Sequence, residues 1–67
     1  MEEFLDKKCY LSIEIDGRNF YYLCALITSI SETHISFNDL TNNNSPHTYR
    51  KSDVVEIKLS NKNSNGN

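Results

Sequence analysis

The chain has 67 residues, enough for one small domain whose single hydrophobic core is near the lower limit for folding without disulfides, metals or partners. Seven basic and nine acidic side chains give a net charge of −2. A protein that coats nucleic acid regardless of base sequence normally has a strong basic excess, because phosphate neutralisation supplies its affinity. The composition therefore disfavours that class of protein.

The chain contains no apolar run near the roughly 18 residues that cross a bilayer and no signal-peptide pattern, so we expect a soluble, cytoplasmic protein without membrane contacts. Its two cysteines, Cys9 and Cys24, lack CxxC spacing, and in a reducing compartment we expect small buried thiols rather than a disulfide. Residues 60–67 have no apolar side chain and are expected to form a disordered polar tail. The single domain is then residues 1–59.

At the N-terminus, acidic residues precede basic ones over residues 2–8, which favours one or two helical turns. From Cys9 to Ile15 apolar and polar residues alternate, and the pattern predicts a half-buried strand with its odd-numbered side chains inside.

Asp16-Gly17 is a strong hairpin signal, because a type I′ turn needs positive φ at both central residues. A two-residue loop sets Ile15 opposite Arg18, whereas a four-residue loop sets Ile15 opposite Phe20. Both registers predict the same inward side chains at the start of the second strand: Phe20, Tyr22 and Cys24. Residues 20–30 are apolar on both faces, which predicts a long bent strand that serves two sheets, with Leu23, Ala25 and Ile27 facing inward beyond the bend.

Three shorter strands follow. Ile35 and Phe37 alternate with polar residues in a third strand that ends at Asp39. Residues 42–48 are polar and predict a loop, residues 48–50 a short fourth strand, and residues 51–53 a tight connection. In the fifth strand the expected inward side chains are Val55, Ile57 and Leu59. Five short strands with one long bent member favour a small all-β barrel, closed or nearly closed.

The segments IDGR, ISETHISFND and TYRKSDVVEI occur in this order over roughly residues 4–59. Together they resemble Sm-like small β-barrels, the Sm and Hfq group, and the element order is also that of SH3-like barrels. The resemblance implies an all-β, five-stranded, strongly bent barrel with a short N-terminal helical segment. It also implies recognition of single-stranded RNA or a nucleotide-like ligand by a homo-oligomer. The chain departs from the family in lacking its usual Gly in strand two.

The resemblance selects three site residues, and Asn38 is added as a fourth member of a site made from loop ends. His34 stands where the family's Asn contacts a base, Arg50 matches the family's Arg, and Lys51 replaces the Gly that follows it. We expect His34 to stack or hydrogen-bond, Arg50 and Lys51 to contact phosphate or a flat ring face, and Asn38 to provide polar readout. The alternative is that Arg50 and Lys51 form a solvated turn and His34 is an ordinary exposed strand residue.

Three tyrosines, Tyr10, Tyr21 and Tyr49, can stack bases on an outer surface or cover barrel ends and a subunit interface, and we favour the interface for at least one. Rings in the resembled family form by strand-edge pairing, here expected between residues 48–50 and residues 54–59 of a neighbouring copy. The alternative function is a protein-interaction adaptor that uses the tyrosines and the mildly acidic surface.

The sequence contains no catalytic signature, and we expect no enzymatic activity and no cofactor. Cys24 lies in an apolar strand, where burial makes a thiol inert. Cys9, Cys24, His34 and His47 lack the paired short spacing that preorganises a zinc site, so no metal is expected.

Overall fold

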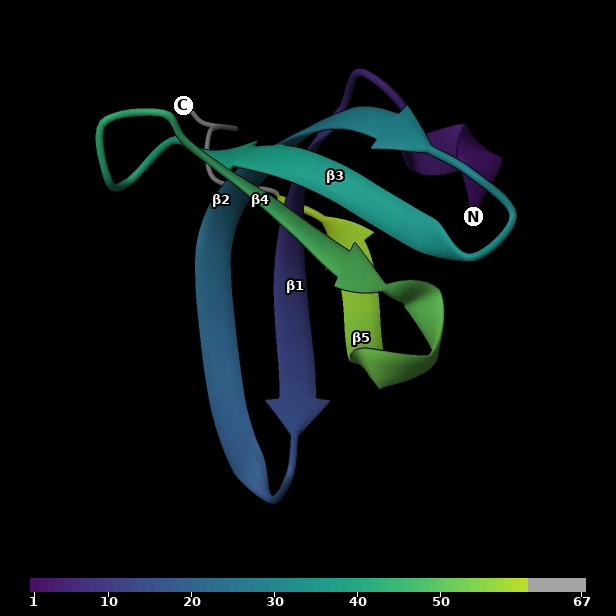
Figure 1. Ribbon diagram of the computed structural model, residues 1–67. Helices are drawn as coiled ribbons and strands as arrows, with labels where there is room; N and C mark the ends of the chain where they lie inside the picture. The colour runs from purple at the N-terminus through teal and green to yellow at the C-terminus, as the bar shows by residue number, and fades with distance from the viewer. Residues whose placement is uncertain (61–67) are drawn as a thin grey trace.

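The computed structural model describes residues 1–60, which form one antiparallel sheet of five strands with very little helix (Figure 1). The strands are β1 (Lys8–Ile15), β2 (Arg18–Ile30), β3 (His34–Asp39), β4 (Ser45–Arg50) and β5 (Val54–Leu59). Their order across the sheet is β4-β3-β2-β1-β5, so β4 and β5 are the edge strands. The all-β prediction is confirmed.

Helical structure is limited to two single turns of 3-10 helix, η1 (Glu2–Phe4) and η2 (Lys51–Asp53). The predicted N-terminal helical segment is therefore one turn, and the predicted tight connection before the last strand is η2. Within the described part of the chain, no helix is long and apolar enough to cross a membrane. Apart from Ser60, the predicted disordered tail lies outside the described residues.

The β1–β2 hairpin closes through the two-residue turn. Asp16 has φ of 51° and Gly17 has φ of 80°, so both central residues are in the left-handed region that a type I′ turn requires. Ile15 lies opposite Arg18, and Ile13 lies opposite Phe20. The shorter of the two predicted registers is therefore the one adopted near the turn.

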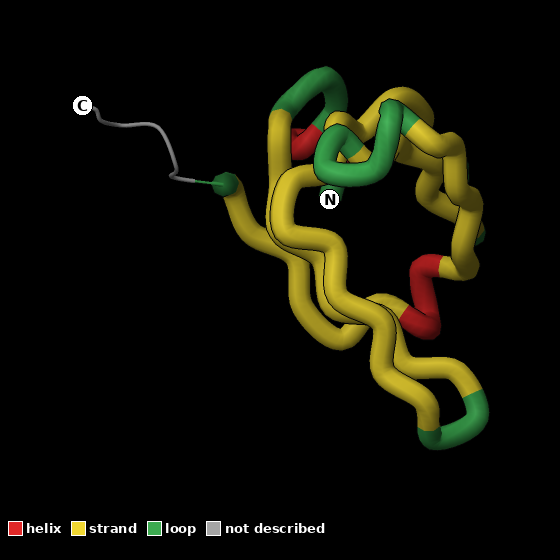
Figure 2. The backbone as a smooth tube through the Cα atoms, turned by 90° about the vertical axis from the view of Figure 1, so that its left-hand side faces the viewer, coloured by secondary structure: helices red, strands yellow, loops and turns green. Residues whose placement is uncertain are grey.

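A bulge then changes the register. Between Cys9 and Leu11 the pairing shifts, so that Cys9 lies opposite Ala25 rather than Cys24. A second shift, between Ile27 and Ser29, interrupts the pairing of β2 with β3. Such bulges bend a strand without requiring glycine. They explain how β2 curves strongly although it contains no Gly (Figure 2).

Burial along β2 follows the predicted change of side only in part. Ala25 and Ile27 are fully buried, as expected beyond the bend. Leu23, expected to face inward with them, is 65% exposed, and Phe20, expected inside, is 38% exposed. The prediction for Leu23 is wrong, because the register shift falls between Tyr22 and Ala25 and the change of side is complete only at Ala25. Phe20 faces the same side as its buried partner Ile13, but it stays partly exposed because β3 pairs with β2 only from Ala25 onward.

The core lies between the curved halves of the sheet. Its fully buried side chains come from the first three strands, namely Cys9, Leu11, Ile13, Ala25, Ile27, Ile35 and Phe37. In β5 the prediction of an alternating inward row is wrong at Val55 and Leu59, which are 62% and 53% exposed. A register shift between Ser12 and Ile13 sets Val54 opposite Ile13, so Val54 packs on the core instead of Val55.

The predicted loop over residues 42–48 is shorter than expected, because β4 begins at Ser45. Pro46 fits into this strand because β4 is at the sheet edge, where a missing N–H leaves no ladder partner unsatisfied. The remaining turn is closed by Asp39, whose Oδ1 accepts hydrogen bonds from the Thr41 N–H at 3.0 Å and the Thr41 hydroxyl at 2.7 Å. The polar composition of this segment thus reflects an edge strand as well as a turn.

Candidate functional site

Two turns that are distant in sequence meet at one end of the sheet. The backbone N–H of Lys51, in η2, donates to the Thr33 carbonyl at 2.8 Å, and its Nζ donates to the Ser31 carbonyl at 3.0 Å. Lys51 therefore ties η2 to the β2–β3 turn through both its backbone and its side chain. This contact holds the first residue of β3 beside the last residue of β4.

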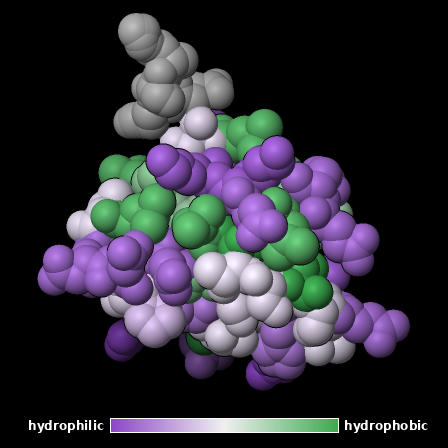
Figure 3. Space-filling view, turned by 90° about the horizontal axis from the view of Figure 1, so that it is seen from above, coloured by the Kyte–Doolittle hydropathy of each residue, from purple (hydrophilic) through white to green (hydrophobic). Residues whose placement is uncertain are grey.

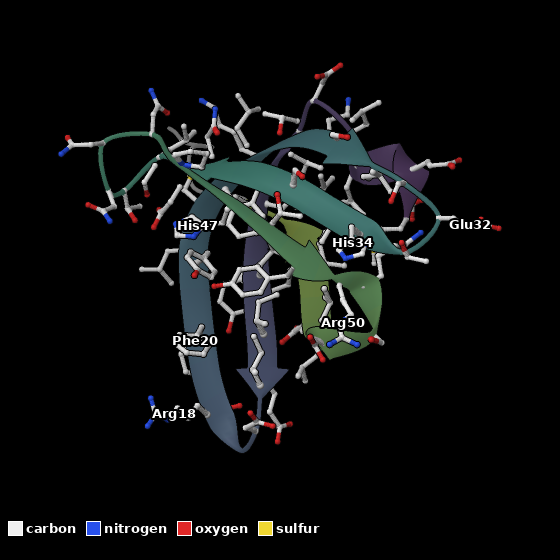
Figure 4. The ribbon with its side chains drawn as sticks, in the orientation of Figure 1. Arg18, Phe20, Glu32, His34, His47 and Arg50 are labelled. Carbon is white, nitrogen blue, oxygen red and sulfur yellow. The ribbon has the colours of Figure 1, made fainter. Side chains whose placement is uncertain are left out.

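These two residues are His34 and Arg50, which are direct cross-strand partners. Both side chains are exposed and project from the η2 end of β3 and β4 (Figure 4). The His34 ring is held by a hydrogen bond between its Nδ1 and the Thr33 hydroxyl at 2.7 Å. Three of the four predicted site residues thus come together, and we call them the His34–Arg50–Lys51 cluster.

The positive charges of the cluster form no ion pair with the acids of residues 1–60. Among residues 1–60 the ion pairs are those of the N-terminal amine with Glu3 and of Lys58 with Glu56, so neither Arg50 nor Lys51 takes part. Glu32 lies in the adjoining turn, but its side chain projects away from Arg50 (Figure 4). An anion that approaches Arg50 therefore meets an unpaired guanidinium, which binds phosphate or carboxylate with fixed geometry.

Asn38, the fourth predicted residue, does not join the cluster. It lies on the same face of β3 as His34 but four positions further along, opposite Pro46. At the rise of a strand this separation is about 14 Å. Between them, the hydroxyls of Ser36 and Thr48 are hydrogen-bonded at 2.9 Å. Asn38 thus belongs to a polar strip along β3 and β4 rather than to a compact site.

The opposite face of the same strands carries an aromatic cluster that was not anticipated from the sequence. It consists of Tyr22, Phe37, His47 and Tyr49. Ring centroids are 4.9 Å apart for Tyr22 and Phe37, and 5.1 Å apart for Tyr22 and His47. The available signal was the alternation of Ser45, His47 and Tyr49, which is recognisable only once these residues are assigned to a strand.

Burial raises the pKa of the Tyr22 hydroxyl, and its hydrogen bond to Tyr49 raises it further. Tyr22 therefore stays neutral through the physiological range and acts as a hydrogen-bonding group. The aromatic cluster is a packed structural unit, because its rings contact one another on several sides.

One contact resembles a catalytic pair. Ser45 Oγ and His47 Nε2 are 3.2 Å apart and hydrogen-bonded. An activated serine also needs a group that orients the histidine. The nearby Asp39 uses its Oδ1 to accept hydrogen bonds from Thr41 instead. The contact between Ser45 and His47 links side chains on one face at the start of β4.

The cysteines and histidines do not gather into a metal-binding cluster within residues 1–60. No three His, Cys, Asp or Glu side chains converge there in a way that could hold a metal ion. Cys9 is fully buried, and this burial raises the pKa of its thiol, with a smaller contribution from Cys24. A thiol in this environment is a poor nucleophile.

The three predicted interface tyrosines occupy different environments. Tyr21 is 60% exposed on the outer face of β2. Tyr10 is half-buried, with Lys58 Nζ 5.3 Å from the centre of its ring. Tyr49 is half-buried in the aromatic cluster. Seen from above, the molecule shows apolar groups separated by hydrophilic ones (Figure 3). Tyr21 is thus the tyrosine best placed to meet a partner.

Comparison of the chain with protein-family models, with curated proteins and with solved structures finds no match in any of the three. We therefore infer a function from the side chains and their arrangement.

Proposed function

We propose that this chain is a non-enzymatic binding module of the small β-barrel type that recognises single-stranded RNA, or a nucleotide-like ligand, at the His34–Arg50–Lys51 cluster. The observation that carries the proposal is the cross-strand pairing of His34 with Arg50, beside a Lys51 that is tied to the adjoining turn. An imidazole and a guanidinium both offer flat faces for a base, and the guanidinium also binds phosphate.

The barrel class and the proposed resemblance to Sm-like or SH3-like proteins are supported by two features. β2 is long and strongly bent, and a 3-10 turn leads from β4 into β5 (Figure 1). In this proposal the edge strands β4 and β5 approach one another across the core. The free thiols of Cys9 and Cys24 suit a cytoplasmic location.

We further propose that the module works as a homo-oligomer. Each edge strand presents backbone N–H and C=O groups that a second strand can pair with. When β4 of one copy pairs with β5 of the next, a copy that has neighbours on both sides has both of its edge strands paired. This pairing also adds buried surface to a domain whose own core is small.

The test is binding of fluorescently labelled U-rich and A-rich RNA oligonucleotides, measured by anisotropy over a range of salt concentrations. Arg50→Ala should weaken binding about tenfold and lower the salt slope by about 0.7, the value for one phosphate contact to a single strand. Lys8→Ala, which removes an exposed charge at the start of β1, is the matched control and should have little effect. Wild-type protein that binds no oligonucleotide at low salt, or equal behaviour of the two variants, would refute the site.

A second candidate function, a protein-interaction adaptor, is favoured by one observation. Tyr21 and Leu23 are 60% and 65% exposed at alternating positions of β2, so they share the outer face of that strand. Exposed aromatic side chains are enriched at protein interfaces. Light scattering of Tyr21→Ser/Leu23→Ser protein tests whether this face instead contacts a second copy: loss of self-association would assign the face to that contact and count against the adaptor, and an unchanged mass would leave it free for another protein.

A further inference from the structure

The inner face of β2 carries a row of side chains that the proposed site does not use. Arg18, Phe20 and Tyr22 alternate along the strand and therefore point to the same side. Their opposite partners on β1 are Ile15, Ile13 and Leu11. Successive members of the row are about 7 Å apart, which is two steps along a strand.

Phe20 is exposed because β1 is the only strand within residues 1–60 that pairs with this part of β2. β3 pairs with β2 only from Ala25 onward, so the end of the hairpin is covered on one side by β1 alone. Figure 1 shows this end extending beyond the rest of the molecule. Although its cross-strand partner Ile13 is fully buried, Phe20 keeps 38% of its surface exposed.

The next ring in the row, that of Tyr22, is packed among other rings. Tyr22 is hydrogen-bonded to Tyr49 and contacts Phe37 and His47. Along β2, Phe20 therefore lies between the aromatic cluster and the cationic side chain of Arg18 (Figure 4). A phenylalanine ring has only two side-chain torsions, so it loses little conformational freedom when a second flat group stacks on it.

The charge at the other end of the row is positive. Arg18 takes part in neither of the ion pairs found in the described chain. Of the two acids near it in the chain, Glu14 pairs with Asn19 and so points to the other face of the hairpin, and Asp16 lies in the turn without an ion pair to Arg18. Arg18 is thus placed to neutralise an anionic ligand that crosses the inner face of β2.

We propose that Arg18 and Phe20 form a stacking platform for single-stranded nucleic acid, with an unpaired base on the Phe20 ring and a neighbouring phosphate on Arg18. Aromatic rings alternating with cations are the usual means of holding single strands, because every base has a flat face. The proposal shares only its ligand class with the His34–Arg50–Lys51 cluster and uses none of its residues.

An apolar peptide is the competing occupant, and the geometry disfavours it. Such peptides anchor side chains in concave pockets. The part of the molecule that is described encloses no pocket. A flat ring beside one cation suits a base and its phosphate better than an apolar side chain.

The experiment uses Phe20→Trp, which introduces the sole tryptophan of the chain. Its fluorescence should be quenched when a short RNA or DNA single strand binds. An abasic oligonucleotide of equal length and charge should quench it much less, because it offers phosphates without bases. Quenching by both oligonucleotides alike, or by an apolar peptide alone, would overturn the platform.

Affinity measurements complete the test. Phe20→Leu, which keeps an apolar side chain but no ring, should weaken binding about fivefold or more, and Phe20→Tyr should restore it. Thermal unfolding of each variant verifies the fold. If Arg50→Ala weakens binding and Phe20→Leu does not, the platform is wrong while the proposed function stands. If Phe20→Leu weakens binding and Arg50→Ala does not, the platform stands and the cluster is wrong.

Discussion

The hydroxyl groups of Tyr22 and Tyr49 lie 2.5 Å apart and form a hydrogen bond between β2 and β4. These strands are not neighbours in the sheet, because β3 lies between them. The two side chains therefore reach across Phe37 of β3, whose ring centroid is 4.9 Å from that of Tyr22 and 5.9 Å from that of Tyr49. This contact holds β4 curved over the inner face of the sheet.

Removal of one hydroxyl should loosen this curvature. We expect Tyr49→Phe to lower the free energy of unfolding by about 0.5–1.5 kcal/mol, the usual net value of one hydrogen bond. Urea denaturation measures the change. Tyr21→Phe is the matched control, because Tyr21 is exposed and should lose almost nothing. Equal losses in the two variants would show that the Tyr22–Tyr49 bond contributes no stability.

Alkaline pH should destabilise the fold through Tyr22. Burial raises the pKa of this hydroxyl above the value of about 10 expected in the unfolded chain. Above that pH the unfolded chain releases the proton while the folded protein retains it, so stability is complete below about pH 10 and falls as pH rises. The free energy of unfolding between pH 8 and 11 should decline more steeply for wild type than for Tyr22→Phe. Parallel curves would contradict this assignment.

The hairpin turn should tolerate a substitution at Asp16 better than one at Gly17. Gly17 has φ of 80°, and a Cβ added there would meet no atom within 4 Å. Gly17→Ala should therefore cost about 1 kcal/mol from backbone conformation alone. Asp16→Asn is the control, because Asn accepts positive φ readily and should leave stability nearly unchanged. Thermal unfolding compares them, and a neutral Gly17→Ala would show that the turn relaxes to another type.

The two thiols should react at different rates. Cys9 is fully buried and its pKa is raised by that burial, whereas Cys24 is only half-buried. A thiol reagent should modify Cys24 in the folded protein and Cys9 only on unfolding. Cys24→Ala should abolish the fast phase, and Cys9→Ala should preserve it. A fast phase that survives in Cys24→Ala would mean that the strand around Cys9 opens readily.

Much of the fold could be predicted because it depends on local signals. The alternation of apolar and polar residues predicted β1 and β3. The Asp16-Gly17 pair predicted the hairpin turn, and the register near this turn is one of the two that were predicted. The pairing of His34 with Arg50 follows from two strands that flank one turn. Asn38 was grouped with them as part of one loop-end site, but the register sets it four positions along β3 from His34.

The remaining features depend on contacts between segments that are distant in sequence. The aromatic cluster joins Tyr22 to residues 15 to 27 positions later. The exposure of Phe20 depends on where β3 begins to pair with β2. Nothing in the immediate neighbourhood of either residue indicates these partners.

The sequence by itself determined the all-β class, the hairpin turn and most of the strands, because each depends on backbone preferences and side-chain period over a few residues. Only the tertiary structure decided which apolar side chains are buried. A single bulge reverses the facing of every residue beyond it, and its position is set by how whole strands pack.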